Sequence, residues 1–299
     1  MKMERKLATI DKEKISAGAI FDGLDISEAT KKDYSTRVGL FLSYVGANRF
    51  QTNTYLNFKR YLERTDYAVA TKNKYLATAR VFLKELARRG VLPFDITYNI
   101  KQFRQSKRHR KEGLTDKDVQ LVGVRLKNMQ DTRRNSRLKA LFSLLAFQGL
   151  RQIEIVRLDV DDIDLARKIA LIRGKGMDDK EIIYLAPATA KTLKEYLKAY
   201  EFKNGALFRS FGNRKSERIS TMTVKREIGG LLKELDIEKT VHGFRHFYVT
   251  ELLKSMDVRD VRKFSRHHSL EMLMVYDDEV SVKEKSQHVF QAMKKFAMN

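Results

Sequence analysis

The stretch "LKALFSLLAFQGLRQIEIVRL", from Leu138 to Leu158, decides how the second half of the chain can fold. As far as Leu150 it is apolar on almost every side, which is typical of a helix buried in a protein core. The continuation "RQIEIVRL" brings Arg151 and Glu154 immediately after this apolar segment. We therefore expect a buried helix over residues 138–150, followed directly by two charged side chains.

The residues after this stretch are predicted to form a small sheet. The segments "DDIDL", "KIALIRG" and "EIIYLA" are β-rich, and "GKGMDD" separates the last two. Gly174, Gly176 and two aspartates favour a turn, so Lys175 is expected at the tip of a β-hairpin. From Thr189 onward the pattern is helical again to the end.

The first hundred residues are predicted to contain a small helical domain, at about residues 20–95. The first helix follows Ser27, a suitable N-cap, and the third ends at Gly90. Only two prolines occur in the chain, which agrees with long helices. The apolar stripes are Tyr34, Val38, Phe41, Leu42 and Val45, then Tyr55, Phe58 and Leu62, then Tyr75, Ala79, Phe82, Leu83 and Leu86.

A basic linker follows the helical domain. The run "KQFRQSKRHRK" contains no acid and lies between two folded segments, so we expect it to contact a phosphate backbone rather than serve only as a solvated spacer. Thr115 then begins a second domain as a probable helix N-cap. The predicted division is 1–100, a linker over 101–113, and 114–299. The candidate DNA-contacting residues are Lys72 and Lys74 of "TKNK", and Lys101, Arg104, Lys107, Arg108, Arg110 and Lys111.

Composition limits the class of protein. The chain has 299 residues, 42% of them hydrophobic, and 60 Lys and Arg against 38 Asp and Glu, giving a net charge of +22. This excess indicates a polyanionic partner, with nucleic acid preferred over a membrane surface. The absence of cysteine excludes disulfides, thiolate nucleophiles and Cys-type zinc sites. No signal-like or membrane-length apolar run is present, so the protein is expected to be soluble and intracellular.

Two stretches contain paired histidines. In "VHGFRHFY", His242 and His246 have a spacing that also suits zinc, but the HExxH arrangement and an obvious third ligand are missing. In "FSRHHSLEMLMVYDDE", His267 and His268 precede Tyr276. Taken alone, Tyr276 lies on an apolar stripe and is interpreted as a packed core ring.

The order Arg, Lys, His-x-x-Arg, His, Tyr along the chain resembles the tyrosine recombinase (phage integrase) family. The resemblance extends over almost the whole chain, and the matched catalytic positions are Arg151, Lys175, His242, Arg245, His267 and Tyr276, with Glu154, His246 and His268 as supporting positions. The family usually places its last histidine nine residues before the tyrosine, a spacing that His267 has, and His268 remains a second candidate. Two positions depart from the pattern. Arg266 stands where glycine usually precedes that histidine, and Gln148 stands where threonine is common.

The resemblance implies a mainly α fold with a small antiparallel β-sheet. It further implies a helical core-binding (SAM-like) domain and a catalytic domain that form a C-shaped clamp on DNA. A C-terminal exchange helix at about residues 282–299 would dock on a neighbouring protomer of a homo-tetramer assembled on paired recombination sites. No metal or other cofactor is implied. The site of action would be the cytoplasm, in association with the nucleoid.

The resemblance also implies a reaction and a role for each residue. Tyr276 would attack a DNA phosphorus atom to give a 3′-phosphotyrosine, and resealing across strands would pass through a Holliday junction without ATP. Arg151, Arg245 and His267 would bind the charged transition state. His242 would assist proton removal or hold the phosphate, and Lys175 would protonate the leaving 5′-oxygen. Glu154 would orient the catalytic groups.

Three other functions stay open at this point. A type IB topoisomerase shares much of this catalytic set but relaxes DNA as a monomer. A catalytically silent, sequence-specific DNA-binding protein would explain the charge without a reaction, although no catalytic position is missing. A metal-dependent nuclease is disfavoured because no acidic cluster accompanies the histidines.

Overall fold

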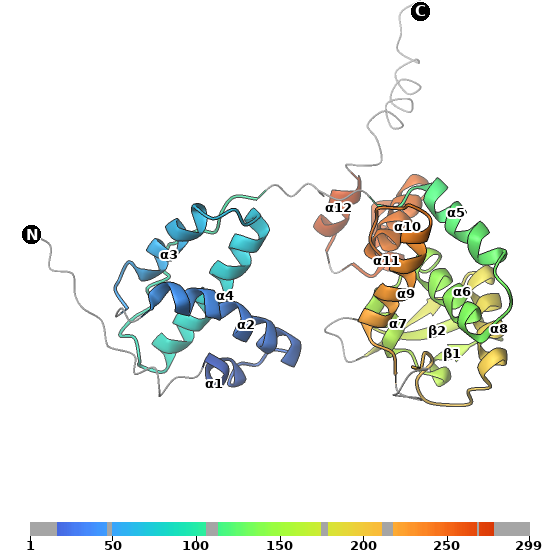
Figure 1. Cartoon of the computed structure of the whole chain (residues 1–299), viewed down its shortest axis with the longest axis horizontal. Helices are drawn as coiled ribbons and strands as arrows, with labels where there is room; N and C mark the ends of the chain where they lie inside the picture. Colours follow the sequence, from blue (N-terminus) through green and yellow to red (C-terminus); the bar gives the residue numbers. More distant parts are fainter. Residues whose placement is uncertain are drawn as a thin grey trace, which may run out of the picture. The chain divides into compact units, whose positions relative to one another are not determined.

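The computed structural model describes residues 17–46, 50–105, 113–174, 179–210, 218–267 and 269–277, apart from the side chains of 17 and 275–277 (Figure 1). The chain divides into two compact units, Met1–Lys107 and Arg108–Asn299, called unit 1 and unit 2 below. The described residues are mainly helical and contain one three-stranded antiparallel sheet, in unit 2, so the predicted fold class is confirmed.

Unit 1 is a small helical bundle. Ser27 caps its second helix and accepts a hydrogen bond from the Thr30 N–H at 3.3 Å, and Gly90 has φ +74° beyond the last helix, as predicted. The short first helix was not predicted. It buries Ile20 and Phe21 against the second and fourth helices. The helices are α1 (Ala17–Asp22), α2 (Glu28–Val45), α3 (Thr54–Glu63) and α4 (Val69–Arg88).

Unit 2 is built around α6 (Arg133–Ala146), which packs against α5, α7, α8, α9 and α10. Leu141 and Leu144 of α6 are completely buried, as expected for a helix that is apolar on nearly all sides. Thr115 caps α5 through a reciprocal capping box with Asp118. The other helices are α5 (Asp116–Lys127), α7 (Gln152–Arg157), α8 (Pro187–Tyr200), α9 (Thr221–Glu234), α10 (His242–Ser255), α11 (Val258–Ser265) and α12 (Glu271–Asp277).

The end of α6 differs from the prediction in a way that matters for the site. The helix stops at Ala146 rather than continuing to Leu150, because the chain turns at Gly149, which has φ +57°. A Cβ added at Gly149 would meet the Tyr248 ring at 2.2 Å, so the backbone approaches this ring more closely than a side chain would allow. The turn brings Arg151 to the N-cap position of α7.

The sheet consists of β1 (Ile163–Asp164), β2 (Ile169–Arg173) and β3 (Lys180–Tyr184) in the order β1-β2-β3, and it follows the 3₁₀ turn η1 (Val160–Asp162). The β2–β3 hairpin is confirmed, with Ile169 opposite Tyr184 and Arg173 opposite Lys180. The predicted tip residue, Lys175, lies outside the described residues.

Between α8 and α9 the chain is not helical in its described residues, 201–210 and 218–220, in contrast to the prediction that helix continues after Thr189. Where it is described, it forms two isolated β-bridges, Asp159–Ala206 and Arg209–Arg218. Arg218 also donates to the carbonyls of Val156 and Leu158. Among the helices of the described ranges, none has the length and apolar character needed to cross a membrane.

Candidate active site

At the start of α7, the Glu154 carboxylate holds Arg151 through two hydrogen bonds. Glu154 accepts a hydrogen bond from the Arg151 backbone N–H at 2.8 Å and another from Arg151 Nη1 at 2.8 Å. The Glu154 side chain is fully buried, whereas that of Arg151 is 21% exposed. Part of the Arg151 guanidinium is therefore accessible to a bound ligand, while the buried Glu154 carboxylate holds the guanidinium in position.

Arg245 lies in the first turn of α10 and is only 1% exposed. Its Nη1 donates to the Gly149 carbonyl at 2.6 Å, and its Nη2 donates to the Ser265 carbonyl. These two bonds join α10 to the turn before Arg151 and to the end of α11. A single guanidinium thus fixes three chain segments that are far apart in the sequence.

His267 directly follows the turn after α11 and is 5% exposed. Its Nδ1 lies 2.7 Å from Ser265 Oγ. Burial, together with the positive charges of Arg245, Arg151, Arg266 and His242, lowers the pKa of His267 to about 3. The imidazole is therefore neutral near pH 7, and three of the four charges that affect it come from residues that the sequence predicts for the site, the fourth being Arg266.

The depressed pKa of His267 predicts a specific pH dependence of stability. The unfolded chain binds a proton on this residue near pH 6.5, whereas the folded chain does so only near pH 3. Between these values stability falls as pH falls, by at most about 1.4 kcal/mol per pH unit. We expect His267→Gln to lose less stability than the wild type between pH 6.5 and 5, as measured by urea unfolding. Equal losses would contradict the prediction.

Glu154 is the shared carboxylate of the site. Besides the two hydrogen bonds from Arg151, Glu154 accepts one from Arg266 Nη2 at 3.3 Å. Burial raises the pKa of a carboxyl group, but Arg266, the hydrogen bonds from Arg151 and the charge of Arg245 outweigh burial and hold the pKa of Glu154 below its ordinary value. One carboxylate thus stands among three guanidiniums, an excess of positive charge that suits a bound phosphate.

Two further residues of α10 have different surroundings. His242, the first residue of the helix, is exposed, and its charge acts on His267. His246 is 5% exposed and lies under Gly113, where an added Cβ would come within 2.3 Å of His246 Nδ1. The His246 ring therefore packs the chain before Thr115 onto α10.

Three predicted residues cannot be placed relative to this cluster. Lys175 and His268 lie outside the described residues, and Tyr276 is described only by its backbone, in α12. That helix packs against α10, with Leu273 completely buried. The structure therefore brings together Arg151, Glu154, His242, Arg245 and His267.

Sequence reasoning missed Ser265 as a partner of His267 and treated Arg266 only as a departure from the family pattern. Arg266 ends α11 with φ +56°, a conformation that glycine adopts more easily, and its side chain is 9% exposed. An arginine at a position typical of glycine was the one sequence signal that could have indicated an additional role.

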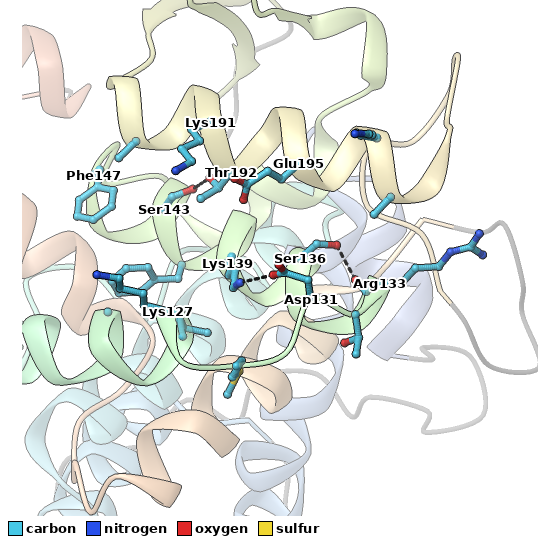
Figure 2. A pocket seen from close by; sticks show the side chains of 18 residues that line it. Lys127, Asp131, Arg133, Ser136, Lys139, Ser143, Phe147, Lys191, Thr192 and Glu195 are labelled. Atoms are coloured by element: carbon cyan, nitrogen blue, oxygen red, sulfur yellow. Dashed lines mark hydrogen bonds and ion pairs between the residues drawn. The ribbon is translucent and has the colours of Figure 1, made fainter.

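Unit 2 contains at least three cavities. One of about 570 Å³ adjoins the candidate site and is lined by Glu181, Arg259, Arg262, Lys263, Arg266, His267 and Leu270. A second, of about 910 Å³, lies between α5, α6 and α8 (Figure 2). Its described lining residues include no candidate catalytic residue, and polar pairs such as Lys139–Asp131 and Ser143–Thr192 lie along it. The third, of about 580 Å³, lies between residues 113–117 and α10 and includes His246. The 570 Å³ cavity is the one lined by Arg266 and His267, so it is the one associated with the site.

The candidate DNA-contacting residues fall into two groups. Lys72 donates to the Glu63 carbonyl at 3.1 Å and is already engaged within unit 1, whereas Lys74, Lys101 and Arg104 are exposed. Phe103 anchors the start of the linker, because Asn73 of α4 exchanges two hydrogen bonds with its backbone. The remaining candidates, Lys107, Arg108, Arg110 and Lys111, lie outside the described residues.

Within the described ranges, no group of three or more His, Asp or Glu side chains is arranged to hold a metal ion.

Comparison with known proteins relates this geometry to a family. The family model described as the phage integrase family matches residues 118–281. The tyrosine recombinase XerD of Listeria innocua is 26% identical over 270 residues, which cover 84% of this chain and 88% of that protein. The tyrosine recombinase XerA of Thermococcus kodakarensis is 29% identical over 147 residues, 48% of this chain and 51% of that protein.

Solved structures of recombinases are also similar to this chain. The XerA recombinase crystal structure matches with a TM-score of 0.52 and 26% identity, covering 91% of this chain and 97% of that one. The XerH site-specific recombinase in its post-cleavage complex with a palindromic difH substrate matches with a TM-score of 0.69 and 18% identity, covering 88% and 80%, which shows the shared fold. Because the family model covers more than half of the chain, the protein belongs to the phage integrase family of tyrosine recombinases.

Proposed function

We propose that this tyrosine recombinase performs site-specific recombination by cleaving and rejoining duplex DNA through a 3′-phosphotyrosine and a Holliday junction. The observation that carries this proposal is the convergence of Arg151, Arg245 and His267 around the buried Glu154, where positive charge exceeds negative charge. A scissile phosphate in this place would supply the missing negative charge. The XerH recombinase, which shares the fold, was solved bound to a palindromic difH substrate, and this supports DNA as the partner proposed here.

The arginines and the histidine would share the transition-state charge. Arg151 and Arg245 remain protonated at any physiological pH and can present several donors to the non-bridging oxygens. His267 would act as a neutral donor. If Ser265 Oγ–H donates to His267 Nδ1 at 2.7 Å, the imidazole carries its proton on Nε2 and offers that proton to the phosphate.

The bond changes are balanced without a metal or ATP. The Tyr276 phenol loses its proton as its oxygen bonds to phosphorus, and the bond to the 5′-oxygen breaks. His242, exposed at the start of α10, would help remove the phenol proton or hold the phosphate. Lys175, in the β2–β3 connection, would give a proton to the departing 5′-oxygen. Attack by another strand's 5′-hydroxyl would reverse the step and release the tyrosine.

We also propose the assembly and location implied by this reaction. Two cleaved duplexes must be held together during strand exchange, which a homo-tetramer on paired sites would do. The segment of about residues 282–299, with Val289, Phe290, Met293 and Phe296 at helical spacing, would link neighbouring protomers. The linker basic residues and Lys74 would contact DNA backbones near the site, at the nucleoid.

Covalent capture tests the function directly. Duplexes that bind the full chain are selected from random DNA, and the winning site is then prepared with a nick next to each candidate scissile phosphate. We expect a protein–DNA adduct that survives denaturing electrophoresis and forms in EDTA without ATP. Tight, selective binding with no adduct at any nick position would contradict the proposal and favour a silent DNA-binding protein. Relaxation of supercoiled plasmid independent of the selected site would favour a topoisomerase.

A further inference from the structure

Arg266 makes contacts that the reaction outlined above does not use. Its Nη2 lies 3.3 Å from Glu154 Oε2, and its Nη1 donates to the Phe264 carbonyl at 2.9 Å. Its Nε is buried and has no hydrogen-bond partner among the described residues. With the side chain only 9% exposed, this guanidinium is directed inward toward Glu154 rather than outward to solvent.

The conformation of Arg266 carries a local cost. The residue has φ +56° and ψ +45°, in the left-handed region, where a Cβ is unfavourable and glycine is not. A buried Nε–H without a partner adds to that cost. Backbone strain at such a position persists only when the surroundings require it, and the contact with Glu154 is the specific interaction that the arginine provides here.

The contact with Glu154 affects what Arg151 can do. Glu154 Oε2 accepts from both Arg266 and the Arg151 backbone N–H, while Oε1 accepts from Arg151 Nη1. If the Arg266 guanidinium were absent, Oε2 would be open to a second bond from the Arg151 side chain. A bidentate Arg151–Glu154 pair would form easily, because the two groups match in shape and charge. Arg151 would then have fewer donors for a phosphate.

We propose that Arg266 is a positioning residue of this active site: it holds the Glu154 carboxylate so that Arg151 keeps its remaining donors directed at the scissile phosphate. The inference rests on the proposed function, because it concerns the same phosphate. It adds a third arginine to the site, one that acts through Glu154 and not on the DNA.

Arg266→Gly is the most informative variant, because glycine relieves the left-handed backbone while the whole side chain, including the guanidinium, is removed. Glu201→Gly is the matched control, since Glu201 also ends a helix, α8, at φ +56° but is exposed and outside the site. We expect single-turnover cleavage of saturated, nicked duplex to slow by about 10- to 100-fold in Arg266→Gly, the usual range for loss of an orienting partner. DNA affinity and the Glu201→Gly rate should stay near wild type.

A double-variant cycle separates positioning from general stability. In a Glu154→Gln background there is no carboxylate to hold, so Arg266→Gly should add little further loss. Arg266→Lys keeps the charge but not the planar fork, and it should recover part of the rate. Full additivity of the Glu154 and Arg266 effects would overturn the proposal, as would a wild-type rate in Arg266→Gly.

A readout independent of cleavage keeps this inference distinct from the proposed function. In a crystal structure of Arg266→Gly, the Arg151 side chain should make two hydrogen bonds to Glu154 rather than one. An unmoved Arg151 would refute the positioning role, whatever the rate. A wild-type chain that forms no adduct would refute the proposed reaction, while a shift of Arg151 in the variant would still support Arg266 as the residue that positions it.

Discussion

Tyr276→Phe is expected to abolish covalent adduct formation on a nicked recognition duplex and leave DNA binding near wild type. The substitution removes the one phenolic oxygen that would bond to phosphorus, and phenylalanine preserves the aromatic ring. The proposed chemistry has no alternative nucleophile, so the adduct should fall below detection, a loss of several orders of magnitude. Denaturing gels of wild type and variant at matched DNA occupancy provide the measurement.

Tyr248→Phe is the matched control, because the Tyr248 phenol lies close enough to Arg245 and Arg266 for their charges to act on it. Its ring packs against Gly149. Burial raises the pKa of Tyr248, although Arg266 and Arg245 act in the opposite direction. A phenol that is harder to ionise and fixed by packing is a poor nucleophile, so Tyr248→Phe should keep the adduct. An adduct that survives Tyr276→Phe and is lost in Tyr248→Phe would reverse the assignment.

The local signals in the sequence predict much of the fold, because they act over a few residues. Ser27 and Thr115 cap helices where their side chains can accept a nearby N–H, and Gly90 lies where a left-handed residue follows a helix. Alternation and turn residues likewise predict the β2–β3 hairpin. The early end of α6 was missed because the apolar run continues to Leu150, although the chain already turns at Gly149. The close approach of Gly149 to the Tyr248 ring, roughly a hundred positions away, arises only in the folded chain.

For the candidate site, too, the sequence predicts the catalytic residues but not the tertiary contacts that hold them. The motif order selects Arg151, Glu154, His242, Arg245 and His267, and the structure brings these residues together. The motif does not show what holds them. The bonds from Arg245 to two distant carbonyls and from Arg266 to Glu154 depend on tertiary geometry and on one left-handed residue. These partners have no spacing rule, so a single sequence cannot reveal them.

Arg245→Lys is expected to reduce the cleavage rate by at least about a hundredfold, although it keeps the positive charge. Lysine offers a point charge in place of a planar fork, so it cannot satisfy the Gly149 and Ser265 carbonyls and also donate to a phosphate. Loss of a single preorganised donor to transition-state charge commonly costs about 10²–10³ in rate. Single-turnover cleavage at saturating DNA measures the effect on the chemical step.

Arg137→Lys distinguishes lost chemistry from lost stability. Arg137 is also a buried arginine of unit 2, 4% exposed, where it pairs with Glu227 and donates to the Arg209 carbonyl. Both substitutions should lower the urea midpoint, because each leaves a buried partner poorly satisfied. Only Arg245→Lys should slow cleavage per folded, DNA-bound molecule. Equal cleavage rates in the two variants would mean that Arg245 holds the fold and does not touch the phosphate. If Arg245→Lys slows cleavage and Arg137→Lys does not, the Arg245 guanidinium acts at the reacting phosphate. The two arginines are alike in burial and charge, so the difference in cleavage rate must come from contact with the phosphate.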